Sequence, residues 1–424
     1  MAAFAPTENA AVVLRAAEAV DWSRLRHLRG PAIDVPALLR GVASDDVEAR
    51  RGALVTLGTR ILPFYDGIDG AVCEVTSHVV PFLARLAAAD VRGAADVLVL
   101  LRRIATVAWD RDPYPRAEAR RPLLATAVGD VARRVLAPPS APRAQSGRLA
   151  RALGFVRGAS SALYRHFDPM TAELLYGHRT HVALCRELPI AFQLLGHPHA
   201  EIRTEAARLV ERLAQSAARP ADLSLRIVKS LENANDEIVV SHLVLGLGYV
   251  GDGPARTLLE ALLDANDPLV RVLAAVALPD PESPEASPPK RLSVLVSALA
   301  TPDPTFRERY ELATSRVLTN DVKAALTARP ADAAPAATHL LTVLAERAER
   351  ELPESFFEVL LDLVFPDAPA PVSPMSLTRD QRLVLRRLAE VTERSRGERD
   401  LSQRLVAKGL PADPRGLARF YALN

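Results

Sequence analysis

Polar and apolar positions repeat as a short phrase in the second half of the chain. Each copy has a polar turn, then an apolar residue and, in most copies, an arginine, and the copies are His197–Ala207, Asn235–Val239, Asn266–Ala275 and Asp303–Arg307. Equivalent positions in successive copies are 36, 32 and 36 residues apart. Asp or Asn at a turn satisfies the free N–H groups of a following helix, so the phrase predicts a helix start. A period of this size predicts a helical solenoid in which each unit is a helix pair.

The first half of the chain fits the same pattern. Ala10–Ala43 predicts two or three short helices, and Asp45–Ala53 repeats the turn phrase before another apolar stretch. A second internal match pairs Glu74–Leu83 with Arg179–Ile190, and the prolines of these two stretches are 108 residues apart, a multiple of 36. A proline within a helical pattern predicts a kinked helix.

These features together resemble HEAT repeats, an armadillo-like class that includes the repeats of PBS-lyase-like proteins. The resemblance is clearest at Asp267–Arg271 and Asp303–Arg307, while Val239 replaces the arginine of the phrase. It implies an all-α fold, a right-handed α-solenoid of stacked antiparallel helix pairs. In the family, the Asp and Arg of the turn form a ladder between neighbouring repeats. The resemblance therefore implies structural roles for Asp267, Arg271, Arg307 and Arg203.

The domain organisation follows from the repeats. A solenoid has no fixed domain size, because each repeat contacts only its neighbours. We therefore expect one continuous solenoid over residues 1–424. Stretches rich in proline and small polar residues predict loop insertions within it, near residues 138–144, 279–290 and 366–375.

Composition agrees with a helical protein of a reducing compartment. Apolar residues make up 49% of the chain and aromatic residues only 5%, which suits close-packed helices rather than strands. Two cysteines cannot form a disulfide framework. The first residues lack a basic leader followed by an apolar run, and no apolar stretch is long enough to span a membrane. We expect a cytoplasmic bacterial protein that does not associate with a membrane.

Two motifs suggest chemistry, and both have a structural alternative that we favour. Gly246–Gly251 spells GxGxxG, which binds a dinucleotide only between a strand and a helix; here it follows a predicted helix, so we expect it to end that helix. His178, His181 and Cys185 share one helix face and are the weak candidates for a zinc site, with Asp168 or Glu187 as a fourth ligand. We favour buried core residues for this group, and we expect neither a metal nor a cofactor.

Two features of the middle of the chain predict binding. Trp109–Pro115 is a loop candidate with exposed aromatic and charged anchors, although Trp109 packing back on the helices is an equal alternative. The segment 111–165 has eleven arginines and three acidic residues, a net charge of +8 in a chain of net charge +2. A patch of this sign favours an acidic partner or phosphates, with a solvated arginine face as the alternative. The candidate binding residues are Trp109, Arg111, Tyr114, Arg116, Arg120, Arg121, Arg148, Arg151 and Arg157.

The function that we favour is a protein-interaction scaffold. No catalytic constellation stands out, so the sequence favours a binding protein over an enzyme. The concave groove of the solenoid is expected to hold a partner protein or peptide, and the second helices that line it are predicted at Asp45–Arg60, Glu201–Gln215 and Leu269–Leu278. The alternative is nucleic-acid backbone binding through segment 111–165, because some HEAT-like proteins are DNA glycosylases. Relatives of bilin lyases are a third possibility, which only the repeats support. The sequence predicts no oligomeric state.

Overall fold

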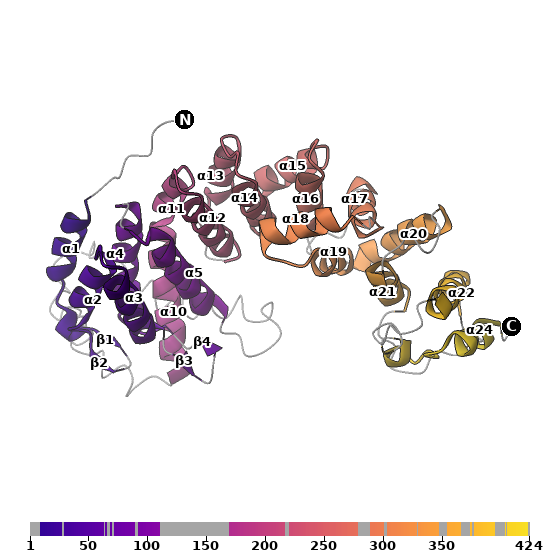
Figure 1. Cartoon of the computed structure of the whole chain (residues 1–424), viewed down its shortest axis with the longest axis horizontal. Coiled ribbons are helices and arrows are strands. Elements are labelled where there is room, and N and C mark those ends of the chain that lie inside the picture. Colours follow the sequence, from indigo (N-terminus) through magenta and orange to yellow (C-terminus); the bar gives the residue numbers. More distant parts are fainter. Residues whose placement is uncertain are drawn as a thin grey trace, which may run out of the picture. The chain divides into compact units, whose positions relative to one another are not determined.

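A computed structural model shows an all-α protein (Figure 1). It describes residues 9–110, 169–278, 289–394 and 403–422, except 28, 63, 66–67, 70–71, 90–91, 217–219, 301–302, 329, 347–353, 366–373, 375–376 and 404. The strands in this part of the chain form two short hairpins, in which β1 (Arg26–His27) pairs with β2 (Gly30–Pro31) and β3 (Phe64–Tyr65) pairs with β4 (Ile68–Asp69). The predicted all-α class is therefore confirmed.

The chain divides into two compact units, the first ending at Arg226 and the second covering Asn235–Asn424. The first unit contains α1 (Ala10–Glu18), η1 (Trp22–Arg24), α2 (Val35–Val42), α3 (Val47–Ile61), α4 (Thr76–Ala88), α5 (Ala94–Asp110), α10 (Pro169–Arg186), α11 (Leu188–Leu194) and α12 (Ala200–Ala214). Helix α13 (Leu223–Leu231) spans the boundary. The predicted short helices of Ala10–Ala43 are α1, η1 and α2.

The second unit is a run of helices with short connections in its first half. They are α14 (Glu237–Val250), α15 (Gly253–Leu262), α16 (Pro268–Ala277), α17 (Pro289–Ala300), α18 (Pro304–Thr314), α19 (Leu318–Thr327), α20 (Pro330–Glu346), α21 (Glu354–Val364), α22 (Arg379–Arg394) and α24 (Pro414–Ala422). The predicted loop at 279–290 is too long by two residues, because α17 begins at Pro289 and proline is tolerated in the first turn of a helix. Residues 138–144 and most of 366–375 lie outside the described residues.

The turn phrases begin helices, as the sequence predicts. Asp46, Asp236, Asp267 and Asp303 each accept a hydrogen bond from a backbone N–H one or two residues into α3, α14, α16 or α18. The copy at α12 differs, because its cap residue His199 makes no such bond. A side-chain cap of this kind typically stabilises a helix by about 1 kcal/mol.

Glycines allow the helices to pack closely. A Cβ atom on Gly248 of α14 would lie 2.4 Å from the carbonyl oxygen of Ala277 in α16, and one on Gly41 of α2 would lie 2.6 Å from Cβ of Ala53 in α3. The GxGxxG motif lies in a helix, as expected: Gly246 and Gly248 are part of α14, and Gly251 ends it with a φ of 64°. Its glycines therefore serve helix packing and helix termination.

The two matched prolines have different effects. Pro81 lies inside α4, as predicted, whereas Pro189 lies in the first turn of a new helix, α11, directly after α10 ends at Arg186. The prediction of a kinked helix is therefore wrong at Pro189, because the chain breaks into two helices there. Within the described residues, no helix combines the length and the apolar character needed to cross a membrane.

Candidate partner-binding faces

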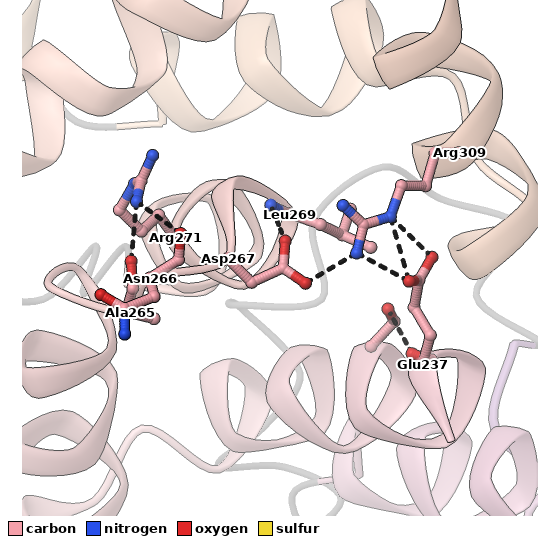
Figure 2. A network of polar contacts seen from close by, with 8 residues as sticks. Glu237, Ala265, Asn266, Asp267, Leu269, Arg271 and Arg309 are labelled. Carbon is pink, nitrogen blue, oxygen red and sulfur yellow. Dashed lines mark hydrogen bonds and ion pairs between the residues drawn. The ribbon is translucent and has the colours of Figure 1, made fainter. Parts of the chain in front are cut away.

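The arginines of the turn phrases bind their own turns. Nη1 of Arg271 donates to the carbonyl oxygens of Ala265 and Asn266, at 2.7 and 3.1 Å (Figure 2). Arg203 donates in the same way to His197 and Pro198, and Arg50 donates to Ser44. Each of these arginines therefore binds the turn that precedes its own helix.

Asp267 is joined to another helix by a different arginine. Nη2 of Arg309, in the second turn of α18, lies 2.6 Å from Oδ2 of Asp267 and 2.7 Å from Oε2 of Glu237 (Figure 2). Nε of Arg309 also donates to both carboxylate oxygens of Glu237, at 3.1 and 3.0 Å. The side chain of Arg307, which has the family position, makes no hydrogen bond to another described residue, and its backbone N–H donates to Asp303. The polar contact of α18 with Asp267 and Glu237 therefore passes through Arg309.

The ionisation of Asp267 reflects this network. Burial opposes ionisation of the carboxyl group, but the hydrogen bonds from Arg309 and from the N–H of Leu269 outweigh it and hold the pKa of Asp267 below its usual range. All three side chains remain partly exposed, at 37% for Arg309, 44% for Glu237 and 40% for Asp267. Solvent therefore weakens each ion pair, and their joint geometry matters more than any one of them.

Helix α18 lies against α14 and α19, and Arg309 reaches the N-terminal ends of α14 and α16 (Figures 1 and 2). Farther along, Nη2 of Arg316 donates to the hydroxyl of Tyr249 at the end of α14, at 3.1 Å. The chain itself therefore covers part of α14.

In the first unit, α5 contacts both α3 and α12. Arg102 of α5 pairs with Glu205 of α12 at 3.0 Å, and Arg212 of α12 lies 3.4 Å from the carbonyl oxygen of Thr106, one turn further on α5. Helices α5 and α12 therefore run in the same direction.

Three guanidinium groups gather where α5 and α12 meet, and we call them the arginine row: Arg102, Arg208 and Arg212. Glu205 binds two of them, with Oε2 3.0 Å from Nε of Arg102 and Oε1 2.7 Å from Nη1 of Arg208. Glu205 is only 10% exposed, whereas Arg102 and Arg208 keep 34% and 26% of their side chains accessible. The two guanidinium groups are therefore more exposed than the carboxylate that they share.

One of the predicted binding residues lies within the described part of the chain. Trp109 is in the last turn of α5, so the prediction of a loop starting at Trp109 is wrong; Pro113 disfavours helix only from the residue before it. The remaining candidates lie outside the described residues: Arg111, Tyr114, Arg116, Arg120, Arg121, Arg148, Arg151 and Arg157. Of the arginine row, Arg102 precedes that segment in sequence, and Arg208 and Arg212 follow it after α10 and α11.

The weak metal candidates lie on α10, where two of the three meet. Nε2 of His181 lies 3.2 Å from Sγ of Cys185 and 2.8 Å from Oγ of Ser216, and His181 is buried. Burial raises the pKa of Cys185 to about 11, so its sulfur is held as a thiol, which is a poor metal ligand. Burial, followed by the charge of Arg179, lowers the pKa of His178. No three His, Cys, Asp or Glu side chains within the described part of the chain are placed to hold a metal ion.

Sequence reasoning missed the arginine row. Glu205, Arg208 and Arg212 share one face of α12 through their spacing, and that signal was available. Arg102 is 103 residues from Glu205, so only the fold shows that it belongs to the same cluster.

No family model matches the chain, and no curated protein matches it. A crystal structure of an engineered protein, from the Northeast Structural Genomics Consortium, aligns over 92% of this chain and 98% of its own, with 15% identity and a TM-score of 0.26. A TM-score of that size supports no argument about fold or function.

Proposed function

We propose that the chain is a HEAT-like α-solenoid of the cytoplasm that binds a partner protein without catalysing a reaction. The partner presents an acidic segment to the second-helix face of the first unit. In the second unit, α14 and α16 lie closely side by side and their N-terminal ends meet at Arg309, which fits parallel second helices of stacked repeats.

The observation that carries this proposal is the arginine row. Its three guanidinium groups belong to two adjacent helices, and two of them share the nearly buried carboxylate of Glu205. Guanidinium groups bind carboxylates with paired N–H donors, so an acidic segment is the protein ligand that fits them best.

The test is binding of a fluorescent Glu-rich peptide to the full chain, measured by anisotropy at low and moderate salt. The variant R102Q/R212Q leaves Arg208 paired with Glu205, so Glu205 keeps an ionic partner. We expect this variant to bind the peptide about tenfold more weakly, because each exposed ion pair contributes about 0.2–1 kcal/mol. The control R24Q/R256Q removes the same charge from exposed arginines of η1 and α15 and should bind as the wild type does. Equal weakening by both variants would show that only net charge matters and would contradict a built site.

Nucleic-acid backbone binding is the second candidate. The observation that favours it is the net charge of +8 in residues 111–165, which lie in sequence between Arg102 and Arg208 of the arginine row. Phosphates would then bind the arginines of this segment, and binding would depend strongly on salt.

A further inference from the structure

Helix α14 is buried on every side and its buried residues are apolar except Ser241 and His242, which is unusual for a second helix of a two-layer repeat. Seven consecutive residues, Ser241–Leu247, are buried, and at 3.6 residues per turn they cover the whole circumference of the helix. Helices α15 and α16 cover part of that circumference, and α18 contacts it as well. A helix that is hydrophobic all round must be covered on all sides. The sequence of α14 therefore requires an occupant where α18 lies.

The attachment of α18 to this place includes exposed polar contacts. Its buried side chains are Tyr310, Ala313 and Thr314, fewer than the six of the similarly long α16. Polar links to α14 and α16 include the bonds of Arg309 to Glu237 and Asp267 and, just after the end of α18, the bond of Arg316 to Tyr249. Exposed ion pairs of this kind are individually weak and are screened by salt.

Both ends of α18 are formed by residues of its own segment. Asp303 caps its N-terminus from within the same segment, so the helix does not depend on α14 for its first turn. Its C-terminus ends at Ser315 with a φ of 57°, the left-handed region that non-glycine residues adopt only at a cost. A locally capped helix next to a strained residue can move as one body, with the rotation absorbed at that residue.

We propose that α18 is a displaceable cover that occupies a helix-binding site formed by α14 and α16. The site combines the apolar surface of α14 with the carboxylates of Glu237 and Asp267. It therefore fits an amphipathic helix that carries an arginine, which is the chemistry that α18 presents. When α18 leaves, a partner helix of the same chemistry takes its place. This proposal concerns the second unit alone and does not depend on the arginine row.

Hydrogen exchange of the full chain, read by mass spectrometry, tests the cover. In R309E, the new carboxylate faces Glu237 and Asp267, so we expect the amides of α18 to exchange about tenfold faster while those of α16 and α19 keep their protection. The double variant E237R/R309E restores an ion pair and should return α18 toward wild-type exchange. The control R256E reverses an equally exposed arginine of α15 and should leave α18 unchanged. Unchanged exchange of α18 in R309E, or equal acceleration of α16 and α19, would overturn the proposal.

A labelled peptide of residues 303–316 tests the site beneath the cover. We expect it to bind R309E, whose own α18 is displaced, at least about tenfold more tightly than it binds the wild type, whose site is filled. No binding to R309E, or equal binding to both proteins, would show that α14 and α16 form no helix-binding site. A measurement on the wild type does not depend on whether R309E folds. Added salt should accelerate hydrogen exchange in α18 more than in α19, because salt screens the ion pairs of Arg309. Equal acceleration in both helices would count against a cover.

Discussion

Arg291 carries a positive charge into the interior of the second unit. It lies in α17, is fully buried, and bonds to three other helices: Nε donates to the carbonyl oxygen of Ala275, Nη1 to Asp332 at 2.8 Å, and Nη2 to the carbonyl oxygen of Ala325. Asp332 is buried to the same degree. A buried charge is tolerated only when its donors and partners are satisfied in this way.

The first residue-scale prediction is the response to loss of this guanidinium. We expect R291M to lower the free energy of unfolding by about 3–5 kcal/mol, because the Asp332 carboxylate then remains buried without its main cation. The double variant R291M/D332N removes the charge as well and should recover part of the loss, though the carbonyls of Ala275 and Ala325 still lack their donor. Urea unfolding followed by circular dichroism measures both. A double variant no more stable than R291M would show that the charge is not what matters.

At the scale of elements, the sequence predicted where helices begin better than it predicted what their side chains bind. The caps at Asp46, Asp236, Asp267 and Asp303 could be read from the chain because a cap is a contact between residues two or three apart. The partner of Asp267 could not, because Arg309 is 42 residues away. Arg307, the arginine at the family position, lies two residues before Arg309, which is less than one helical turn. Only the placement of α18 across α14 and α16 decides which arginine reaches the carboxylate.

The second prediction uses two glycines within helices. G248A should lower the free energy of unfolding by about 1–3 kcal/mol, because its Cβ would lie 2.4 Å from the carbonyl oxygen of Ala277 and force α14 from α16. G52A in α3 is the matched control: nothing lies within 4 Å of its Cβ position, and alanine favours helix by up to about 1 kcal/mol over glycine. The midpoint temperature of thermal unfolding should therefore fall for G248A and rise for G52A. Two shifts of the same sign would contradict the close packing of α14 on α16.

At the scale of the whole molecule, charge is distributed unevenly along the chain. The chain has a net charge of +2, whereas residues 111–165 carry +8, so the remainder is acidic. If the chain is the repeat array that we propose, position in sequence maps to position along the array, and this asymmetry becomes a local field. Arg102, in the middle of α5, precedes this segment in sequence, and Arg208 and Arg212 of α12 follow it after α10 and α11. We expect a segment of this charge to attract a polyanion.

That field gives the last prediction, which separates the two proposed functions. If the basic segment binds phosphates, the full chain should bind duplex DNA of any sequence at low salt. This binding should weaken and disappear as the salt concentration approaches the physiological value. Each phosphate contact adds about 0.9 to the slope of log affinity against log salt. The variant R116S/R120S/R121S should reduce that slope by about 2–3, while R24S/R40S/R256S, with the same net charge, should leave it unchanged. Mobility shift over a salt series measures both. Sequence-specific binding that survives moderate salt would favour a dedicated nucleic-acid protein over a protein scaffold. No binding at low salt would remove the nucleic-acid alternative, because the arginines of segment 111–165 would then not be accessible to phosphates, and would leave an acidic protein segment as the ligand for the arginine row.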